Sequence, residues 1–326
     1  MQNQISPLIL SFGGSDPLGA IGIQADLGSF AAMGCHGLTV ITAILVGDTT
    51  QINDIEAIDA DILVEQARTI LEDVPVSAFK LGTIGSVENV SAIAEIVSDY
   101  PEVPLIFDLF SSAIPDQGQD SEDIFLAASE LIIPQTTLLL ASAVEISRLA
   151  ETWREPSIED TLAQDVQHLI ESGCEYVLVT GTGNVLNEVA NSLFDQSGII
   201  RHDSWPRQAG SYMGAGATLS AAIAALIANG LDVHDAVLEA QEFTNAALAH
   251  AQRFGMGKLV PDRYFWAREP ENNSIPDDVE SQSDDANGDC STTAQADKPP
   301  VGQPLVDQPD SITIKNTISH PNSEHN

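Results

Sequence analysis

Residues 13–26 read Gly-Gly-Ser-Asp-Pro-Leu-Gly-Ala-Ile-Gly-Ile-Gln-Ala-Asp, and their place between two apolar segments decides the fold class. The segment before them, residues 8–12, is the strand-like run Leu-Ile-Leu-Ser-Phe. The segment from Ile23 to Met33 is amphipathic and ends at Gly34. A glycine-rich turn that joins a buried strand to a helix is typical of the first unit of an α/β fold.

The following residues continue this alternation of short apolar runs with longer amphipathic ones. The predicted strands cover residues 8–12, 38–46, 78–81, 105–108, 137–140 and 176–179. The predicted helices cover residues 23–33, 59–73, 86–99, 122–131, 143–152, 158–172, a segment around Leu219 that ends at Gly230, and about 233–253. This order predicts an α/β fold with a central, mostly parallel sheet sandwiched between helices. Ligands of such folds bind beyond the carboxyl ends of the strands.

We predict a single domain over residues 1–267, followed by a disordered acidic tail over residues 268–326. From Glu269 onward, Pro, Ser, Asn, Gln and Asp dominate, and 12 acidic residues face only 2 basic ones. A segment with so few apolar residues cannot bury enough surface to offset its ordering entropy.

The charge of the chain excludes one class of partner. With 48 acidic and 12 basic residues, the formal net charge is −36, so the surface repels nucleic acid and anionic lipid. We therefore expect no nucleic-acid partner, and we interpret the acidity mainly as a source of solubility or as adaptation to salt or cold. A phosphate ligand would need local backbone dipoles to hold it against this field.

The remaining composition predicts a cytoplasmic protein that does not contact a membrane. The N-terminus Met-Gln-Asn-Gln carries no basic region, and no apolar run reaches the roughly 18 residues of a membrane helix. The three cysteines, Cys35, Cys174 and Cys290, are odd in number and widely spaced, which argues against a disulfide framework or a zinc site.

The first glycine-rich segment matches neither of two well-known phosphate motifs. Gly14 and Gly19 have the spacing of P-loop glycines, but Ala20 and Ile21 stand where that motif needs Lys and Ser or Thr. The segment also lacks the GxGxxG pattern of dinucleotide-binding folds. Taken alone, it is equally well explained as a tight turn that needs glycine.

The second glycine-rich segment is Gly214-Ala215-Gly216-Ala217, directly before the helix around Leu219. Small residues at a helix start leave several backbone N–H groups accessible at the positive end of the helix dipole, which predicts an anion site. The alternative is a helix whose small residues serve close packing.

Together, the two segments resemble the hydroxymethylpyrimidine/phosphomethylpyrimidine kinases of thiamine biosynthesis, a branch of the ribokinase-like superfamily. The resemblance spans residues 8–261, and its most specific part is Gly-Ile-Gln-Ala-Asp at 22–26. Further matching positions are Val40–Ala43, Lys80-Leu81-Gly82, Glu145, residues 214–220, Gly255–Lys258 and Pro261.

The resemblance implies a ribokinase-like domain with a pyrimidine pocket at the first loop and ATP with Mg2+ across the C-terminal half. Residues 214–217 would form the catalytic anion hole. The positions that the resemblance assigns to the ligands are Gly14, Asp26 and Gly47 for the pyrimidine, Asp108 and Glu145 for the metal and ATP, and Thr180 and Gly181 for the nucleotide. The family commonly forms dimers, so a homodimer is one arrangement open to this chain.

Several positions depart from the family pattern. Gly47 stands where the family has a pyrimidine-contacting glutamine, Thr180 where it has a lysine, and Ser142 where it has an asparagine. The loop after Asp108 also lacks the family's lid sequence. Ala217 occupies the position of an aspartate in the superfamily and a cysteine in this branch.

These departures leave three functions open. The first is an ATP-dependent kinase of hydroxymethylpyrimidine, its monophosphate or both in thiamine diphosphate biosynthesis. We expect the monophosphate to be the preferred acceptor, since a methyl group at Ala217 cannot accept a proton from an alcohol. The second is a non-catalytic relative that binds the pyrimidine or its phosphate as a sensor or partner protein. The third is a kinase of another small hydroxylated substrate, for which Gly47 would reflect a changed pocket.

Overall fold

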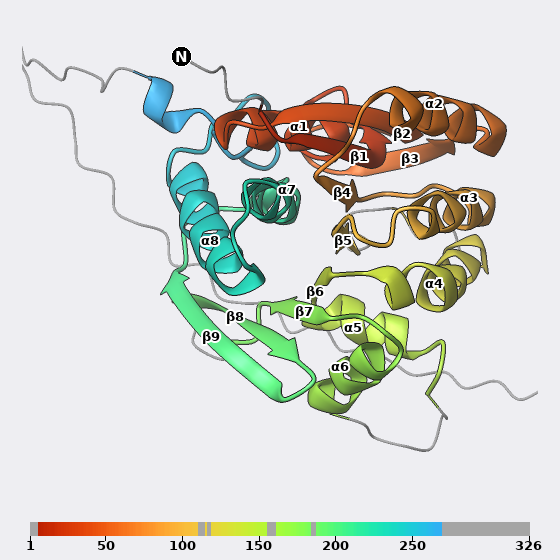
Figure 1. Ribbon diagram of the computed structural model, residues 1–326. Coiled ribbons are helices and arrows are strands. Elements are labelled where there is room, and N and C mark those ends of the chain that lie inside the picture. Colours follow the sequence, from red (N-terminus) through yellow and green to blue (C-terminus); the bar gives the residue numbers. More distant parts are fainter. Residues whose placement is uncertain (1–5, 110–114, 116–118, 155–160, 184–186, 269–326) are drawn as a thin grey trace, which may run out of the picture. The chain divides into compact units, whose positions relative to one another are not determined.

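The computed structural model describes residues 6–109, 115, 119–154, 161–183 and 187–268, all of which belong to one compact unit. Its center is a nine-stranded sheet in the order β3-β2-β1-β4-β5-β6-β7-β8-β9 (Figure 1). The strands are β1 (Leu8–Ser15), β2 (His36–Gly47), β3 (Ile52–Ala57), β4 (Ala78–Leu81), β5 (Leu105–Asp108), β6 (Leu138–Ser142), β7 (Tyr176–Thr180), β8 (Glu188–Asp195) and β9 (Gly198–Pro206).

In sheet order, the six strands from β2 to β7 are parallel to one another. Strand β3 pairs antiparallel with β2, β8 with β7, and β9 with β8. The helices are α1 (Gly22–Ala32), α2 (Ala60–Asp73), α3 (Val87–Ser98), α4 (Gln119–Leu131), α5 (Ala143–Ala150), α6 (Leu162–Glu171), α7 (Ala215–Ala228) and α8 (Val233–Ala249). Two short 3-10 turns cover Ile133–Gln135 and Phe265–Ala267. The predicted α/β class and mostly parallel sheet are confirmed.

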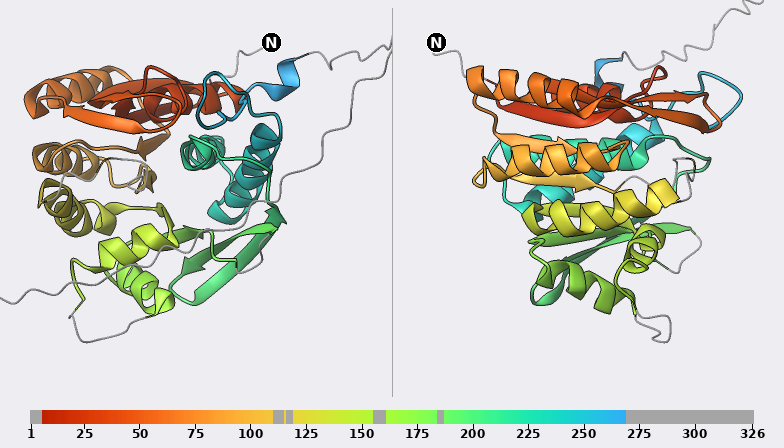
Figure 2. Two further views of the ribbon diagram at one scale, coloured as in Figure 1. Left: turned by 180° about the vertical axis from the view of Figure 1, so that it is seen from behind. Right: turned by 90° about the vertical axis from the view of Figure 1, so that its right-hand side faces the viewer.

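Helices cover both faces of the sheet, as alternation along the strands requires. Leu10 and Phe12 of β1 point into a core that also contains apolar residues of α2 to α6, whereas Ile9 points into a second core with α1, α7 and α8. Figures 1 and 2 show α2 to α6 stacked along one face and the other three helices on the opposite face.

Helix α7 is buried almost all round, which fixes the position of its first turn. Ten of its 14 residues are buried, and they pack against β4, β5, α1 and α8. A helix that is apolar on every side is buried on every side, so the elements packed around it fix its position. The chain leaves it at Gly230, whose positive φ of 97° suits the glycine predicted to end the helix.

The structure also corrects the predicted elements. The first strand does not end at Phe12 but continues to Ser15 through an irregularity between Gly13 and Gly14, so these two glycines lie in the sheet and not in the turn. The antiparallel strands β3, β8 and β9 were not predicted. The helix predicted over about 233–253, which is α8, ends at Ala249, four residues before the predicted end at Arg253.

The tail from Glu269 onward lies outside the described residues, so the predicted domain boundary stays a prediction. Arg268, its first predicted residue, is described: its Nε donates to Asp262 Oδ2 over 2.5 Å. None of the helices in the described part of the chain combines the length and the apolar character needed to cross a membrane.

Candidate active site

The two glycine-rich segments predicted from the sequence lie against each other. Gly214, the residue before α7, has a positive φ of 96°, and a Cβ atom there would lie 1.9 Å from the carbonyl oxygen of Ala20. No side chain other than hydrogen fits this contact. The first loop, which we define as residues 16–22, and the start of α7 therefore belong to one site at the carboxyl end of β1.

Asp16 holds the first loop from inside. Its carboxylate is buried and accepts hydrogen bonds from three backbone N–H groups, those of Leu18 (3.0 Å), Ala20 (2.8 Å) and Ile21 (2.9 Å). Gln24 adds two more contacts, because it accepts from the N–H of Asp16 and donates to Ser15 Oγ, both over 2.9 Å. The polar residues of this motif thus shape the loop itself.

Gly14, a predicted pyrimidine contact, is buried in β1. A Cβ atom at this residue would lie 3.1 Å from the side chain of Leu45, and one at Gly22 would lie 2.0 Å from the carbonyl oxygen of Gly14. Gly22 also has a positive φ of 63°. Gly22 is therefore needed for the chain to turn back on β1, whereas a side chain at Gly14 would displace Leu45 slightly. The contact of Gly14 with a ligand stays a prediction.

Asp26, the second predicted pyrimidine contact, is fully buried in α1. Its Oδ1 lies 3.0 Å from Nζ of Lys80, which is itself 2% exposed, and its Oδ2 accepts from Ser11 Oγ over 2.6 Å. A buried charge needs such a partner, because removal of either side chain would leave the other charge uncompensated. This ion pair joins α1, β1 and β4 directly beneath the first loop.

Asp108, a predicted metal ligand, ends β5 and is 4% exposed. Burial raises the pKa of its carboxyl to about 6, the negative charges of Glu145 and Asp26 raise it as well, and the charge of Lys80 lowers it. Its Oδ2 accepts from Ser220 Oγ of α7 over 2.9 Å. The carboxylate is therefore tied to the helix that carries the predicted anion site.

Glu145, the other predicted metal ligand, lies in the first turn of α5. Its Oε2 accepts from the N–H of Ser142 over 2.8 Å, and its own N–H donates to Ser142 Oγ over 3.2 Å. This is a capping box, in which both residues satisfy backbone groups at a helix start. The serine that replaces the family's asparagine thus has a structural task here.

The start of α7 offers open backbone donors. Gly214 supplies no capping side chain, so the first N–H groups, those of residues 215–217, have no partner within the helix. Ala215 and Gly216 are partly exposed, whereas Ala217 is 3% exposed and packs in an apolar cluster with Ala20, Ile21 and Met213. The described residues thus fit an anion site, without a proton acceptor at Ala217.

Gly47 has a structural reason to be glycine. A Cβ atom there would lie 2.6 Å from the carbonyl oxygen of Gln51 and 2.9 Å from Cα of Ile52, because β2 turns tightly into β3. A glutamine at this position requires a wider hairpin. The missing family contact is therefore linked to the shape of the β2–β3 turn.

Thr180 and Gly181, the predicted nucleotide contacts, lie at the carboxyl end of β7. Gly181 is exposed, has a positive φ of 73°, and donates its N–H to Asn191 Oδ1 over 3.2 Å. Asn191 in turn donates to Gln241 Oε1 of α8 over 2.7 Å. This chain of amides fixes the backbone after β7, although no cation replaces the family's lysine at Thr180.

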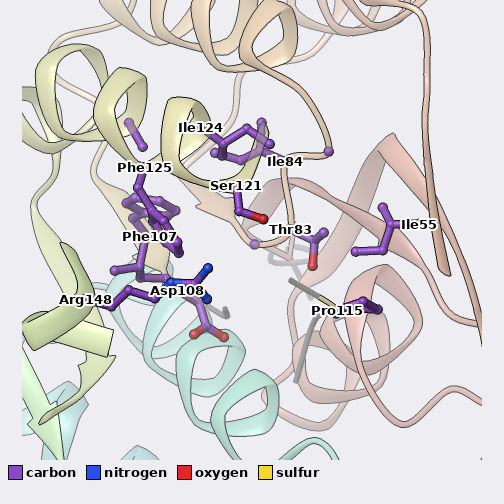
Figure 3. A pocket seen from close by; sticks show the side chains of 14 residues that line it. Ile55, Thr83, Ile84, Phe107, Asp108, Pro115, Ser121, Ile124, Phe125 and Arg148 are labelled. Atoms are coloured by element: carbon purple, nitrogen blue, oxygen red, sulfur yellow. The ribbon is translucent and has the colours of Figure 1, made fainter. Parts of the chain in front are cut away.

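A small cavity of about 70 Å3 lies at the carboxyl ends of β4 and β5. Apolar residues such as Phe107, Ile124 and Phe125 make up most of its lining, and its polar side chains are Thr83, Asp108, Ser121 and Arg148. Figure 3 shows Asp108 at this cavity with its carboxylate directed toward α7. Asp108 thus connects the cavity with the second turn of α7.

The described residues fit a magnesium ion that also binds phosphate. Within the described ranges, no three His, Cys, Asp or Glu side chains are grouped closely enough to hold a metal ion by themselves. Mg2+ commonly takes only one or two carboxylates and fills its other positions with phosphate oxygens and water. The charge of Glu145 raises the pKa of Asp108, and the role of the two carboxylates as metal ligands stays a prediction.

Solved structures with the same architecture define the class of protein. The chain superposes on pyridoxal kinase from Staphylococcus aureus with a TM-score of 0.71 at 22% identity, covering 81% of this chain and 96% of that one. It also superposes on phosphomethylpyrimidine kinase from Clostridium difficile with a TM-score of 0.61 at 25% identity, covering 74% and 100%. The fold is that of the ribokinase-like kinases of small molecules.

The chain belongs to the phosphomethylpyrimidine kinase family, whose model matches residues 16–262. It is 29% identical over 259 residues to the hydroxymethylpyrimidine/phosphomethylpyrimidine kinase of Salmonella typhimurium, covering 79% of this chain and 97% of that one. A putative pyridoxine kinase of Treponema pallidum is 27% identical, with coverage of 77% and 96%. The family predicted from the sequence is confirmed.

Sequence reasoning missed three side chains that build the site: Asp16, Ser220 and Arg263. Lys80 belongs to a motif of the resemblance, and a lysine inside the buried run Ala-Phe-Lys-Leu also signals a buried carboxylate partner. No pattern in the sequence distinguishes Arg263, whose importance comes from contacts with residues more than 200 positions away.

Proposed function

We propose that this protein transfers a phosphoryl group from ATP to hydroxymethylpyrimidine, to its monophosphate, or to both, in thiamine diphosphate biosynthesis, and that it prefers the monophosphate. The observation that carries this preference is the first turn of α7. Its backbone donors are open, but Ala217, at the position of the family's proton acceptor, presents a buried methyl group.

The two acceptors make different demands on this turn. A hydroxymethyl group must lose a proton as it attacks, and loss of a general base typically costs about 10² to 10⁴ in rate. A phosphate monoester has a second pKa near about 6, so it is already an anionic nucleophile at neutral pH. Phosphoryl transfer otherwise depends mainly on positioning and electrostatic stabilization, which the backbone of residues 214–217 can supply.

The nucleotide half of the site rests on residues at the ends of β5, β6 and β7. Asp108 and Glu145 would hold Mg2+, and Thr180 with Gly181 would lie along the nucleotide. When bound, the metal neutralizes charge on the transferred phosphoryl group. Burial raises the pKa of Asp108, and a bound cation would favor its ionized form.

The pyrimidine half would involve Gly14, Asp26 and Gly47. In this structure Asp26 is bound to Lys80 and Ser11, so direct contact with a ring nitrogen requires an exchange of partners. Without that exchange, the buried pair would support the first loop from below, and backbone groups of the loop would contact the ring.

A specific observation favors a second candidate, a non-catalytic protein that binds the pyrimidine or its phosphate. Gly47, Ser142, Thr180 and Ala217 all replace residues that the family pattern assigns to its active site. Two of these replacements have structural tasks, namely Gly47 in the hairpin and Ser142 in the capping box. The argument for lost catalysis therefore rests mainly on Thr180 and Ala217.

A coupled assay of ADP release with each acceptor tests the proposal. We expect turnover of the monophosphate to exceed that of the free alcohol, and faster turnover of the alcohol would contradict the preference. Isothermal titration decides between kinase and sensor: binding of both pyrimidine and Mg-ATP supports the kinase, whereas pyrimidine binding alone supports the sensor.

A variant that restores a proton acceptor at position 217 makes the assay more specific. Ala217→Cys should raise turnover of the alcohol by about 10-fold or more and leave turnover of the monophosphate nearly unchanged. Equal gains with both acceptors would mean that the residue acts on the phosphoryl donor instead.

We also propose a cytoplasmic location and a homodimeric assembly, both on the strength of the family relationship. Sedimentation of the purified protein at micromolar concentration tests the assembly.

A further inference from the structure

Arg263 connects the parts of the site that the proposed reaction must bring together. It follows Pro261 and Asp262, and its side chain is only 6% exposed. Nη1 donates to the carbonyl oxygen of Gly19 over 3.1 Å, and Nη2 donates to that of Ala20 over 2.7 Å. One guanidinium thus binds two consecutive carbonyls of the first loop.

The same guanidinium also reaches α7. Its Nε donates to Thr218 Oγ1 over 3.1 Å, and this hydroxyl donates to the carbonyl oxygen of Gly214 over 2.7 Å. The series Arg263, Thr218, Gly214 therefore runs from the first loop to the residue that precedes the open N–H groups of α7.

The partners of Arg263 distinguish it from an ordinary buried ion pair. Among the described residues, no carboxylate oxygen lies within 4.0 Å of its guanidinium nitrogens. Burial lowers its pKa to about 10, so the group stays charged at neutral pH. Its hydrogen bonds to two carbonyls and a hydroxyl, together with the nearby charges of Asp26 and Asp16, which raise its pKa, offset the cost of burying this cation.

The anchor behind Arg263 is rigid as well. Asp262 donates its N–H to the carbonyl oxygen of Ala247 over 3.0 Å, and its carboxylate accepts from Gln252 Nε2 over 2.9 Å. The backbone that carries Arg263 is therefore fixed to the end of α8. The side chain of Arg263 therefore extends into the site from a backbone segment that is held in place by hydrogen bonds.

We propose that Arg263 is a positioning residue that sets the distance between the first loop and the anion site at the start of α7. This inference rests on the proposed function, in which one segment holds the acceptor and the other the transferred phosphoryl group. Each segment keeps its own ligand contacts without Arg263, so its loss should misplace two bound substrates and not prevent their binding.

Kinetics of Arg263→Ala and Arg263→Lys test the role. We expect kcat of Arg263→Ala to fall by roughly 10- to 100-fold while KM for either substrate changes by less than about threefold, because misplacement by about 1 Å costs up to about 10² in rate. Arg263→Lys should recover little, since one ammonium cannot bind two carbonyls and a hydroxyl as a planar fork does. Millimolar guanidinium chloride should partly restore kcat of Arg263→Ala.

Arg68→Met is the matched control. It removes a partly exposed cation of α2, whose partners are Glu95 of α3 and Asp99 directly after that helix. Its kcat should equal that of the wild type. Wild-type kcat in Arg263→Lys, or a change in KM alone in Arg263→Ala, would overturn the proposal.

Amide hydrogen exchange gives a readout that does not depend on activity. In folded Arg263→Lys, residues 16–22 and 214–218 should both exchange faster than in the wild type, and α4 should be unchanged. Unchanged exchange in both segments would overturn the positioning role of Arg263 even if activity falls. If the wild type releases no ADP but exchange is faster in Arg263→Lys, the positioning role of Arg263 is supported and the kinase function is rejected.

Discussion

The first loop and the start of α7 are both rich in glycine and lie in contact, but their backbone groups are used differently. The N–H groups of the loop bind Asp16, and two of its carbonyls bind Arg263. The first N–H groups of α7 bind neither a capping side chain nor another turn of the helix. The loop is thus internally satisfied and serves as framework, whereas the helix start keeps its donors for a ligand.

Substitution of Gly214 should give the largest effect, because this residue joins the two segments. In Gly214→Ala the new methyl group would meet the carbonyl oxygen of Ala20 at 1.9 Å in a left-handed backbone. We expect a loss of about 2–5 kcal/mol in unfolding free energy, from backbone strain plus overpacking. Urea denaturation measures it.

Gly230→Ala provides the control at the other end of the same helix. Gly230 has nearly the same φ of 97°, but its Cβ would meet nothing within 4 Å. Its substitution should cost only about 1–2 kcal/mol, the backbone strain alone. Equal losses for both variants would mean that the contact between the segments contributes nothing.

Asp108 should behave as a carboxylate kept for a ligand at the expense of stability. Burial raises its pKa from 3.8 to about 6, so the native state binds a proton more tightly than the unfolded chain, and this contribution to stability is lost as the pH rises through 6. Asp108→Asn should therefore be more stable than the wild type at pH 8, by about 2–3 kcal/mol, and nearly equal to it near pH 4.

The measurement is the difference in urea unfolding free energy between the two proteins at each pH. The difference isolates Asp108, because every other carboxylate titrates in both proteins. Activity of Asp108→Asn should be low at both pH values if the carboxylate holds the metal. A constant difference across the pH range would contradict the burial argument.

Asp16 is the opposite case, an acidic side chain whose three backbone donors satisfy it. In Asp16→Asn one oxygen becomes an NH2 group that cannot accept from the loop, so the variant should lose about 1.5–3 kcal/mol of unfolding free energy. Asp48→Asn is the control, because Asp48 accepts from Thr50 and Gln51 in an exposed turn, where water replaces a lost contact. Similar losses would remove the distinction between framework and surface turn.

The same contrast explains what the sequence could and could not predict. The parallel strands and their helices follow from apolar runs such as residues 38–46, because burial on both faces imposes a clear pattern. The edge strand β3 has only two buried residues in six, and none of the nine residues of β9 is buried, so neither gives an apolar run. The turn at Asp195–Gly198 was a usable signal for the β8–β9 hairpin.

Site residues divide along a similar line. The open donors of α7 were predictable, because small residues before an apolar helix are a local feature. The partners of Asp26 and Asp108 depend on which strands are neighbors, and the contacts of Arg263 on how the chain end packs, neither of which local patterns specify.

The smallest expected effect on stability, with a clear effect on binding, belongs to Gly216. A Cβ atom at this residue meets nothing within 4 Å, and alanine in a helix is more favorable than glycine by up to about 1 kcal/mol. Gly216→Ala should therefore raise the melting temperature slightly. Its methyl group enters the space before the open N–H groups, and loss of one charge-assisted contact of about 1.5 kcal/mol corresponds to a roughly 10-fold higher KM for ATP. A higher melting temperature with unchanged KM would place the phosphate elsewhere and make the start of α7 a second framework segment.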